Sequence, residues 1–208
     1  RFKCDWSSDV CSSDPTFAAF NGHLHCFQYL REQGQGCTWD IWTTVSAAES
    51  GNLPCLQYLK EQGCPWDEQA PTGAAENGHL HCLQYLREQG CPWDETASEA
   101  AAENGHLSCL QYLREHGCPW NEKASEAAAE NGHLSCLQYL REQGCPWDEK
   151  ASEAAADYGN LHCLDYLTEQ GCPWSITATA HTICNAEGAV LNNDIDICRS
   201  EEHTSELQ

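Results

Sequence analysis

Residues 123–149 read KASEAAAENGHLSCLQYLREQGCPWDE, and close copies of this 27-residue unit recur along much of the chain. The marker tripeptide is Gly-His-Leu at 78–80, 105–107 and 132–134, and Gly-Asn-Leu at 51–53 and 159–161. A unit of this size cannot bury its own apolar face, so it must stack on copies of itself. The period therefore predicts a solenoid whose exposed flank is a binding surface.

Each unit is predicted to form two short helices, here over 123–131 and 133–142, divided by a tight turn. Gly132 suits the left-handed position past the end of the first helix, because glycine has no Cβ to clash there. Gly144 ends the second helix in a similar way, and Pro146 lacks the backbone donor that a continuing helix needs. The chain should then leave as an extended loop and enter the next unit.

The two helices carry different apolar side chains. Leu134, Leu137 and Leu140 lie three residues apart in the second helix, so this helix should be buried between its neighbours. The alanines at 127–129 in the first helix should let an adjacent helix approach closely. Trp147 lies in the connecting loop and recurs after Cys-Pro in other units. We expect it to cover the seam between two units; the alternative is an aromatic ladder that binds a ligand.

The composition is strongly acidic, with 10 basic against 32 acidic side chains and a formal net charge of −22. The negative electrostatic potential of such a chain repels phosphate backbones and anionic lipids, so neither nucleic acid nor a membrane is an expected partner. Another protein with a basic surface fits better, although the acidic side chains could also form only a solvated face. The sequence contains no apolar run long enough to span a membrane.

Cysteine is abundant, with 16 in the chain and two in each unit, such as Cys136 and Cys145. The two cysteines flank one helix, so about 12 Å of helical rise separates them, too far for a disulfide or a shared metal ion. We interpret them as reduced, buried thiols, which is typical of a cytoplasmic protein. A zinc or redox ladder formed between units remains the minor alternative.

Catalytic residues are not expected, because the histidines and the acidic side chains recur with the architecture of the unit. His79, His106 and His133 share one position and should brace the turn between the helices. The sequence contains no P-loop, no glycine-rich dinucleotide fingerprint and no His-Glu-x-x-His pair. We therefore predict a protein without catalytic, cofactor-binding or metal-binding residues.

Several positions of the unit at 96–117 match a known repeat signature at its spacing, namely Thr96, Ala101, Ala102, Gly105, His106, Leu107, Leu110, Leu113 and Gly117. The unit resembles an ankyrin repeat. The resemblance covers about six units over 15–176. It implies an all-α solenoid of stacked helix-turn-helix repeats that binds another protein without catalysing a reaction.

The units also depart from the ankyrin pattern. The usual ankyrin unit has 33 residues, and the shorter unit here is reduced in the loop at 145–149. The projecting β-hairpin is therefore expected to be shortened or absent. The family's Thr-Pro-Leu-His is mostly missing from the first helix, since Thr96 is followed by Ala-Ser-Glu. Binding modes that use the hairpin should not apply.

The two ends of the chain are predicted not to be native protein. Residues 5–14 can be encoded by GACTGGAGTTCAGACGTGTGCTCTTCCGAT and 199–208 by AGATCGGAAGAGCACACGTCTGAACTCCAG, and these strings are reverse complements over nearly their whole length. They resemble a sequencing adapter read in opposite directions, so we set 1–14 and 199–208 apart from the fold. The stretch at 177–198 loses the repeat register and is either a degenerate capping repeat or a frame-shifted tail.

We expect the chain to act as a monomeric, cytoplasmic scaffold that displays an acidic surface to another protein. The candidate binding residues form two rows on the first helices, with one aromatic anchor, and are Glu99, Glu126 and Glu153, then Glu103, Glu130 and Asp157, and Tyr158. The middle units are nearly identical, which favours a second hypothesis. In that hypothesis the solenoid is a spacer or targeting arm of a larger protein whose effector domain is absent from this chain.

Overall fold

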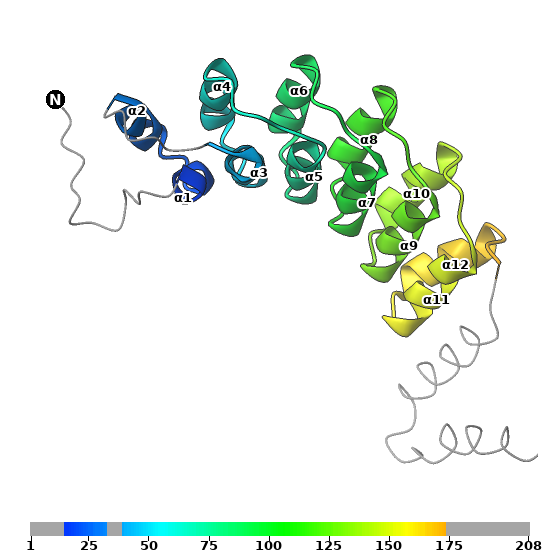
Figure 1. Ribbon diagram of the computed structural model, residues 1–208. Helices are drawn as coiled ribbons and strands as arrows, with labels where there is room; N and C mark the ends of the chain where they lie inside the picture. The colour runs from blue at the N-terminus through cyan, green and yellow to red at the C-terminus, as the bar shows by residue number, and fades with distance from the viewer. Residues whose placement is uncertain (1–14, 33–38, 174–208) are drawn as a thin grey trace, which may run out of the picture.

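The computed structural model describes residues 15–32 and 39–173, and this part of the chain is a curved stack of helix pairs without strands (Figure 1). The first helices of the pairs are α1 (Pro15–Phe20), α3 (Ile41–Glu49), α5 (Gln69–Glu76), α7 (Glu95–Glu103), α9 (Glu122–Glu130) and α11 (Glu149–Asp157). The second helices are α2 (Leu24–Glu32), α4 (Leu53–Glu61), α6 (Leu80–Glu88), α8 (Leu107–Glu115), α10 (Leu134–Glu142) and α12 (Leu161–Glu169). The predicted all-α solenoid of about six units is confirmed.

The helix ends follow from local residues. Asn121 precedes α9 with an extended backbone, and its side chain accepts a hydrogen bond from the Lys123 amide at 3.0 Å, so it caps the helix. Gly132 has a φ of 73°, and the amide of His133 then donates to Ala128 O at 2.8 Å, which closes the turn. The predicted helix at 123–131 is therefore shifted by one residue, while the predicted turn is confirmed.

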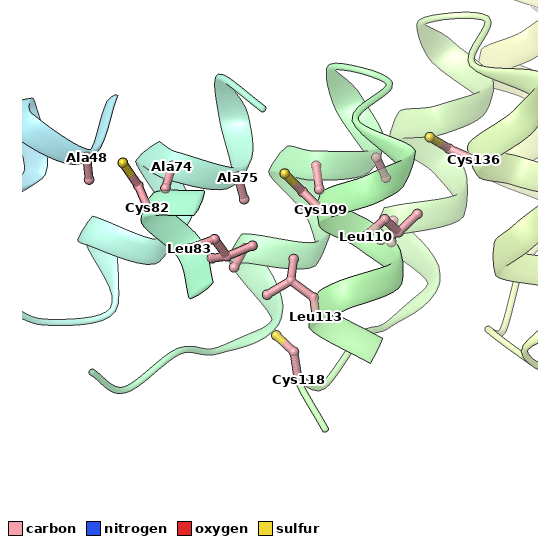
Figure 2. Packing of buried hydrophobic residues seen from close by; sticks show 14 of the residues in the cluster. Ala48, Ala74, Ala75, Cys82, Leu83, Cys109, Leu110, Leu113, Cys118 and Cys136 are labelled. Atoms are coloured by element: carbon pink, nitrogen blue, oxygen red, sulfur yellow. The ribbon is translucent and has the colours of Figure 1, made fainter. Parts of the chain in front are cut away.

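Residue size sets the curvature of the solenoid. The first helices carry fully buried alanines such as Ala101 and Ala128, and they pack closely against one another. The second helices carry buried leucines such as Leu110 and Leu137, and they make far fewer contacts with each other. The stack therefore bends toward the first helices, which line the inner side of the curve (Figure 1). Figure 2 shows these small and large side chains meeting between neighbouring units.

The tryptophans cover the seams, as the sequence predicted for Trp147. Each described loop tryptophan from Trp66 onward is half-buried against the core and lies beneath a cation from the end of the preceding helix. The pairs are Lys60 with Trp66 at 3.6 Å, Arg87 with Trp93 at 4.3 Å, Arg114 with Trp120 at 4.2 Å and Arg141 with Trp147 at 4.3 Å, from cation to ring centroid. These basic side chains are thus engaged in packing. Trp174 lies outside the described residues.

Buried hydroxyl and thiol groups tie each unit together. Ser98 Oγ in α7 donates to Pro119 O at 3.1 Å and lies 3.4 Å from Cys118 Sγ. Cys118 Sγ in turn donates to the carbonyl of Asp94, the cap of α7, at 3.1 Å. The cysteine that follows a second helix therefore holds the start of the first helix of its own unit. The same thiol-to-carbonyl bond is made by Cys64, Cys91, Cys145 and Cys172.

Substitution of Ser98 with alanine is expected to cost about 1–2 kcal/mol, because the carbonyl of Pro119 loses its donor in a part-buried site. The pKa of Cys118 should also rise, since the Ser98 hydroxyl lowers it. Urea unfolding checks the first effect. Ser135→Ala, on an exposed face of α10, is the control and should change stability by less than about 0.5 kcal/mol. Equal losses in both variants would contradict the prediction.

Candidate protein-interaction surface

Each first helix exposes one stripe on the inner side of the curve. In α7 the side chains of Thr96 and Glu103 are exposed and Glu99 is half-buried, while the alanines between them face the core. Second helices cover the opposite side of each first helix, and neighbouring first helices cover its flanks. The free surface of the first helices is therefore a band that runs across the units along the inside of the solenoid.

A row of carboxylates follows this band at one position per unit, two residues before the turn glycine. We name this set the acidic row; it consists of Glu49, Glu76, Glu103, Glu130 and Asp157. The side chain of Glu49 leans over Gly73 of the next unit, where a Cβ would lie 2.6 Å from its Cγ. Burial raises the pKa of Glu49, and the negative charge of Glu76 raises it further. The carboxylates of Glu49 and Glu76 therefore repel one another.

The predicted row of Glu99, Glu126 and Glu153 lies one helical turn away and is half-buried. Glu99 Oε1 accepts a hydrogen bond from Asn121 Nδ2 at 2.9 Å, so this carboxylate links α7 to the cap of the next first helix. Lys123 and Lys150 precede Glu126 and Glu153 by one turn. Part of this row therefore serves the stacking of units.

Tyr158 follows the last carboxylate of the acidic row and is 65% exposed. Its hydroxyl is hydrogen-bonded to the Glu130 carboxylate, and this bond, followed by the charge of Glu130, raises the pKa of Tyr158. The structure thus brings Glu130, Asp157 and Tyr158 together at the C-terminal end of the band. Glu103 lies at the same position one unit earlier.

Sequence reasoning missed two residues of the acidic row and three exposed apolar residues near the N-terminal end of the described helices. Glu49 and Glu76 belong to the acidic row and could have been found from their place two residues before Gly51 and Gly78. The other three are large exposed apolar side chains, namely Phe17 at 44%, Phe20 at 55% and Trp42 at 57%. The signal for these was a departure from the repeat, because Phe20 occupies the position of the carboxylate in every later unit.

The histidines brace the turns, as predicted. A Cβ built on Gly78 would lie 2.6 Å from Nδ1 of His106, so the ring rests on the turn of the preceding unit. Asn160 replaces histidine in the last described unit, and its Nδ2 donates to Ala129 O at 2.9 Å. Burial is the main cause that lowers the pKa of His79. These rings are part of the stacking and do not lie in the acidic row.

Ten described cysteines are free and buried, namely Cys55, Cys64, Cys82, Cys91, Cys109, Cys118, Cys136, Cys145, Cys163 and Cys172. Cys26 is disulfide-bonded, so the interpretation as reduced thiols holds for these ten and is wrong for Cys26. Burial raises the pKa of Cys82 and Cys91 to about 12. A thiol that stays protonated is a weak ligand and a weak nucleophile. No group of three potential metal ligands occurs in residues 15–32 and 39–173.

A family model described as ankyrin repeats, in three copies, matches residues 44–124. These units are ankyrin repeats. The chain is also similar in structure to the human ASB11 ankyrin repeat domain, known from a crystal structure, with a TM-score of 0.64 and 21% sequence identity. This similarity covers 78% of the chain and 85% of that domain, and it concerns the fold. No curated protein matches the chain.

The helix pairs extend beyond the matched segment, from Pro15 to Glu169, and keep the same turns. In the described part of these units the loops contain no strand. The β-hairpin was predicted to be shortened or absent because the unit is short. None of the helices in that part is long and apolar enough to cross a membrane. Ankyrin repeat domains mediate protein–protein interactions, which the resemblance had implied.

Proposed function

We propose that this ankyrin solenoid is a non-enzymatic scaffold that holds a basic protein surface against the acidic row. The observation that carries the proposal is the recurrence of an acidic residue at one inner position of five successive first helices. The charge of Glu76 raises the pKa of Glu49, so like-charge repulsion disfavours the ionised form of this pair. A cationic partner removes this repulsion when it binds, and its charge also speeds the encounter.

The distribution of basic residues supports the same proposal. Lys60, Arg87, Arg114 and Arg141 lie at the ends of second helices, where each cation stacks on a tryptophan. These four side chains therefore do not neutralise the acidic row. Lys123 and Lys150 lie on the first helices at the position of Thr96, where they neutralise part of the negative charge of the band. The formal net charge of −22 also disfavours self-association, which supports a monomer.

The thiols support a cytoplasmic location and disfavour the zinc or redox alternative. Ten of the eleven described cysteines are free, which is typical of a reducing compartment, and the disulfide-bonded Cys26 is the exception. Metal binding and redox exchange both use the thiolate, whereas burial raises the pKa of Cys109 and Cys136 to about 11. Metal analysis of protein purified under reducing conditions should therefore find no stoichiometric zinc, and one zinc ion per unit would overturn this part of the proposal.

The test compares two neutralised variants of equal net charge. The row variant carries E49Q, E76Q, E103Q, E130Q and D157N. The control variant carries E61Q, E88Q, E115Q, E142Q and E169Q, which neutralises exposed carboxylates at the ends of the second helices. Circular dichroism first establishes that both variants fold.

Immobilised wild-type chain and both variants are then exposed to the same cell lysate, and the bound proteins are quantified by mass spectrometry. We expect proteins that bind the wild type and the control variant and are depleted at least tenfold on the row variant. The same bound set on all three proteins would contradict a role of the acidic row. That outcome would favour the spacer or targeting-arm hypothesis.

A further inference from the structure

Several turns between the paired helices carry an asparagine directly before the turn glycine. These pairs are Asn21-Gly22, Asn77-Gly78, Asn104-Gly105 and Asn131-Gly132. Asn-Gly pairs are especially prone to spontaneous deamidation, because glycine has no Cβ to hinder attack by its backbone nitrogen. In this reaction the glycine nitrogen attacks Cγ of the asparagine, and the side-chain amide leaves as ammonia. Water then opens the cyclic imide at either carbonyl and leaves aspartate or isoaspartate.

The folded turn keeps the two reacting atoms apart. Asn104 ends α7 with a ψ of 6°, and Asn77 and Asn131 have ψ values of 7° and 5°. A ψ near zero eclipses the glycine nitrogen with the backbone nitrogen of the asparagine, whereas closure of the imide ring requires it to eclipse Cβ. The glycine nitrogen is therefore turned away from Cγ, and the backbone must rotate before the ring can close.

Hydrogen bonds also occupy both reacting groups. The side-chain amide of Asn104 donates to Ala100 O at 3.1 Å, and the amide of Gly105 donates to Ala102 O at 3.3 Å. The equivalent side-chain bonds, at 2.9, 3.0 and 3.0 Å, are made by Asn21, Asn77 and Asn131. The glycine nitrogen must lose its proton to attack, so the reaction also breaks the hydrogen bond that closes the turn.

The next unit holds each of these turns in place. A Cβ added to Gly105 would lie 2.5 Å from Nδ1 of His133, so this ring rests on the turn that contains Asn104. Asn160 rests on Gly132 in the same way. Rotation of the backbone at Asn104 would displace the turn from beneath the ring. Local separation of the two units must therefore precede the reaction.

We propose that the Asn-Gly pairs are self-modification sites that the stacked solenoid holds inactive, and that each pair deamidates when its unit opens. The asparagines are exposed, so water reaches the imide once it has formed. Each product adds a negative charge next to a carboxylate of the acidic row, since the preceding residues are Glu76, Glu103 and Glu130 in three of the pairs. Isoaspartate also inserts a methylene group into the main chain of the turn. The chain thus keeps a permanent chemical record of unit opening, which goes beyond its role as a scaffold.

Peptide mapping of the full chain by mass spectrometry tests the protection. The chain is incubated at mildly alkaline pH in water labelled with heavy oxygen, which marks each asparagine that is hydrolysed, either folded or unfolded in guanidinium chloride. We expect at least tenfold slower labelling of Asn77, Asn104 and Asn131 in the folded chain. Asn52, Asn121 and Asn160 precede larger residues and should gain little label in either sample. Equal rates in the two samples, or no labelling of the Asn-Gly pairs in the unfolded chain, would overturn the inference.

Two variants test whether the neighbouring unit controls the reaction. His133→Ala removes the ring over Gly105 and should accelerate labelling of Asn104 at least threefold, while Asn77, whose turn lies beneath His106, keeps its rate. His133→Asn is the matched control, because Asn160 fills the same position and donates to Ala129 O at 2.9 Å. This control should leave both rates unchanged. An unchanged rate at Asn104 in a folded His133→Ala chain would overturn the role of the neighbouring unit.

The wild-type chain provides a second measurement that does not depend on how well a variant folds. Labelling is followed at denaturant concentrations below the unfolding midpoint. Local opening predicts that labelling accelerates before circular dichroism detects any loss of helix, and by different factors in different units. Labelling that rises only with global unfolding, and equally at every pair, would overturn the proposal that single units open.

Discussion

Replacement of Gly105 with alanine is expected to destabilise the solenoid by about 2–5 kcal/mol, whereas the same replacement of Gly117 should cost about 1–2 kcal/mol. Both glycines have a left-handed backbone, with φ values of 73° and 77°. An added Cβ on Gly105 would lie 2.5 Å from Nδ1 of His133, and one on Gly117 would meet nothing within 4 Å. The difference between the two variants therefore measures the contact between units.

Urea unfolding followed by circular dichroism provides the free energies for this comparison. A double-mutant cycle with His133→Ala isolates the contact, because removal of the ring should make Gly105→Ala no more costly than Gly117→Ala. Equal costs for the two single variants would mean that the histidine ring moves away freely. In that case the histidines would not lock the turns of successive units.

The second large effect is an expected loss of stability in alkali. An unperturbed thiol has a pKa of about 8.5. Burial raises the pKa of Cys82 and Cys91 to about 12, and it raises those of Cys55, Cys109, Cys118, Cys136 and Cys145 to about 11. At a pH between the unperturbed pKa and these raised values, the folded chain keeps protons that the unfolded chain releases. A rise in pH therefore favours unfolding. Each such thiol increases the unfolding constant about tenfold per pH unit in this range.

We therefore expect the urea midpoint to be nearly constant from pH 7 to pH 8 and to fall steeply above about pH 9. The measurement is made under a reducing agent, so that oxidation does not contribute. The control is a variant with Cys82→Ala, Cys109→Ala and Cys136→Ala, which lacks three of the titrating thiols. Its midpoint should fall less steeply with pH, and identical slopes would contradict the assignment to the cysteines.

The repeating elements of the fold were predictable from the sequence because they depend on local chemistry. The turn at Gly132 follows from its missing Cβ, and the close approach of first helices follows from alanines such as Ala128. The helix start was placed one residue late, since Asn121 caps α9 through a side-chain contact that the pattern did not single out. Nothing in the structure tests the boundaries at 14, 176 and 198, which lie in or beside residues outside the description.

The role of the cysteines was only half predictable. Cys109 and Cys136 act as small buried side chains in the second helices, as interpreted. Cys118, by contrast, donates to the carbonyl of Asp94, which lies 24 residues away in the sequence. Such a bond depends on how the loop folds back on its own unit. Periodicity places each residue on a face, but it does not reveal which groups distant in the sequence meet.

The candidate surface shows the same limit. The sequence identified Glu103, Glu130 and Asp157 as a row, and their true neighbours Glu49 and Glu76 follow from the same register. Phe20 was not predicted, because the prediction used residue types that recur at one position of the unit. Phe20 replaces the recurring carboxylate at that position. The exposure of this ring depends on tertiary structure, which the pattern of one unit does not contain.

The nearly identical sequences of neighbouring units have a genetic consequence. α8 and α10 both read LSCLQYLRE, and the main contacts of each described unit are with the units before and after it. Unequal recombination between such copies would insert or delete one whole unit and recreate the same interfaces at the junction. Each event would lengthen or shorten the acidic row by one carboxylate. The gene can therefore change the length of the acidic row in single steps, without passing through a misfolded intermediate.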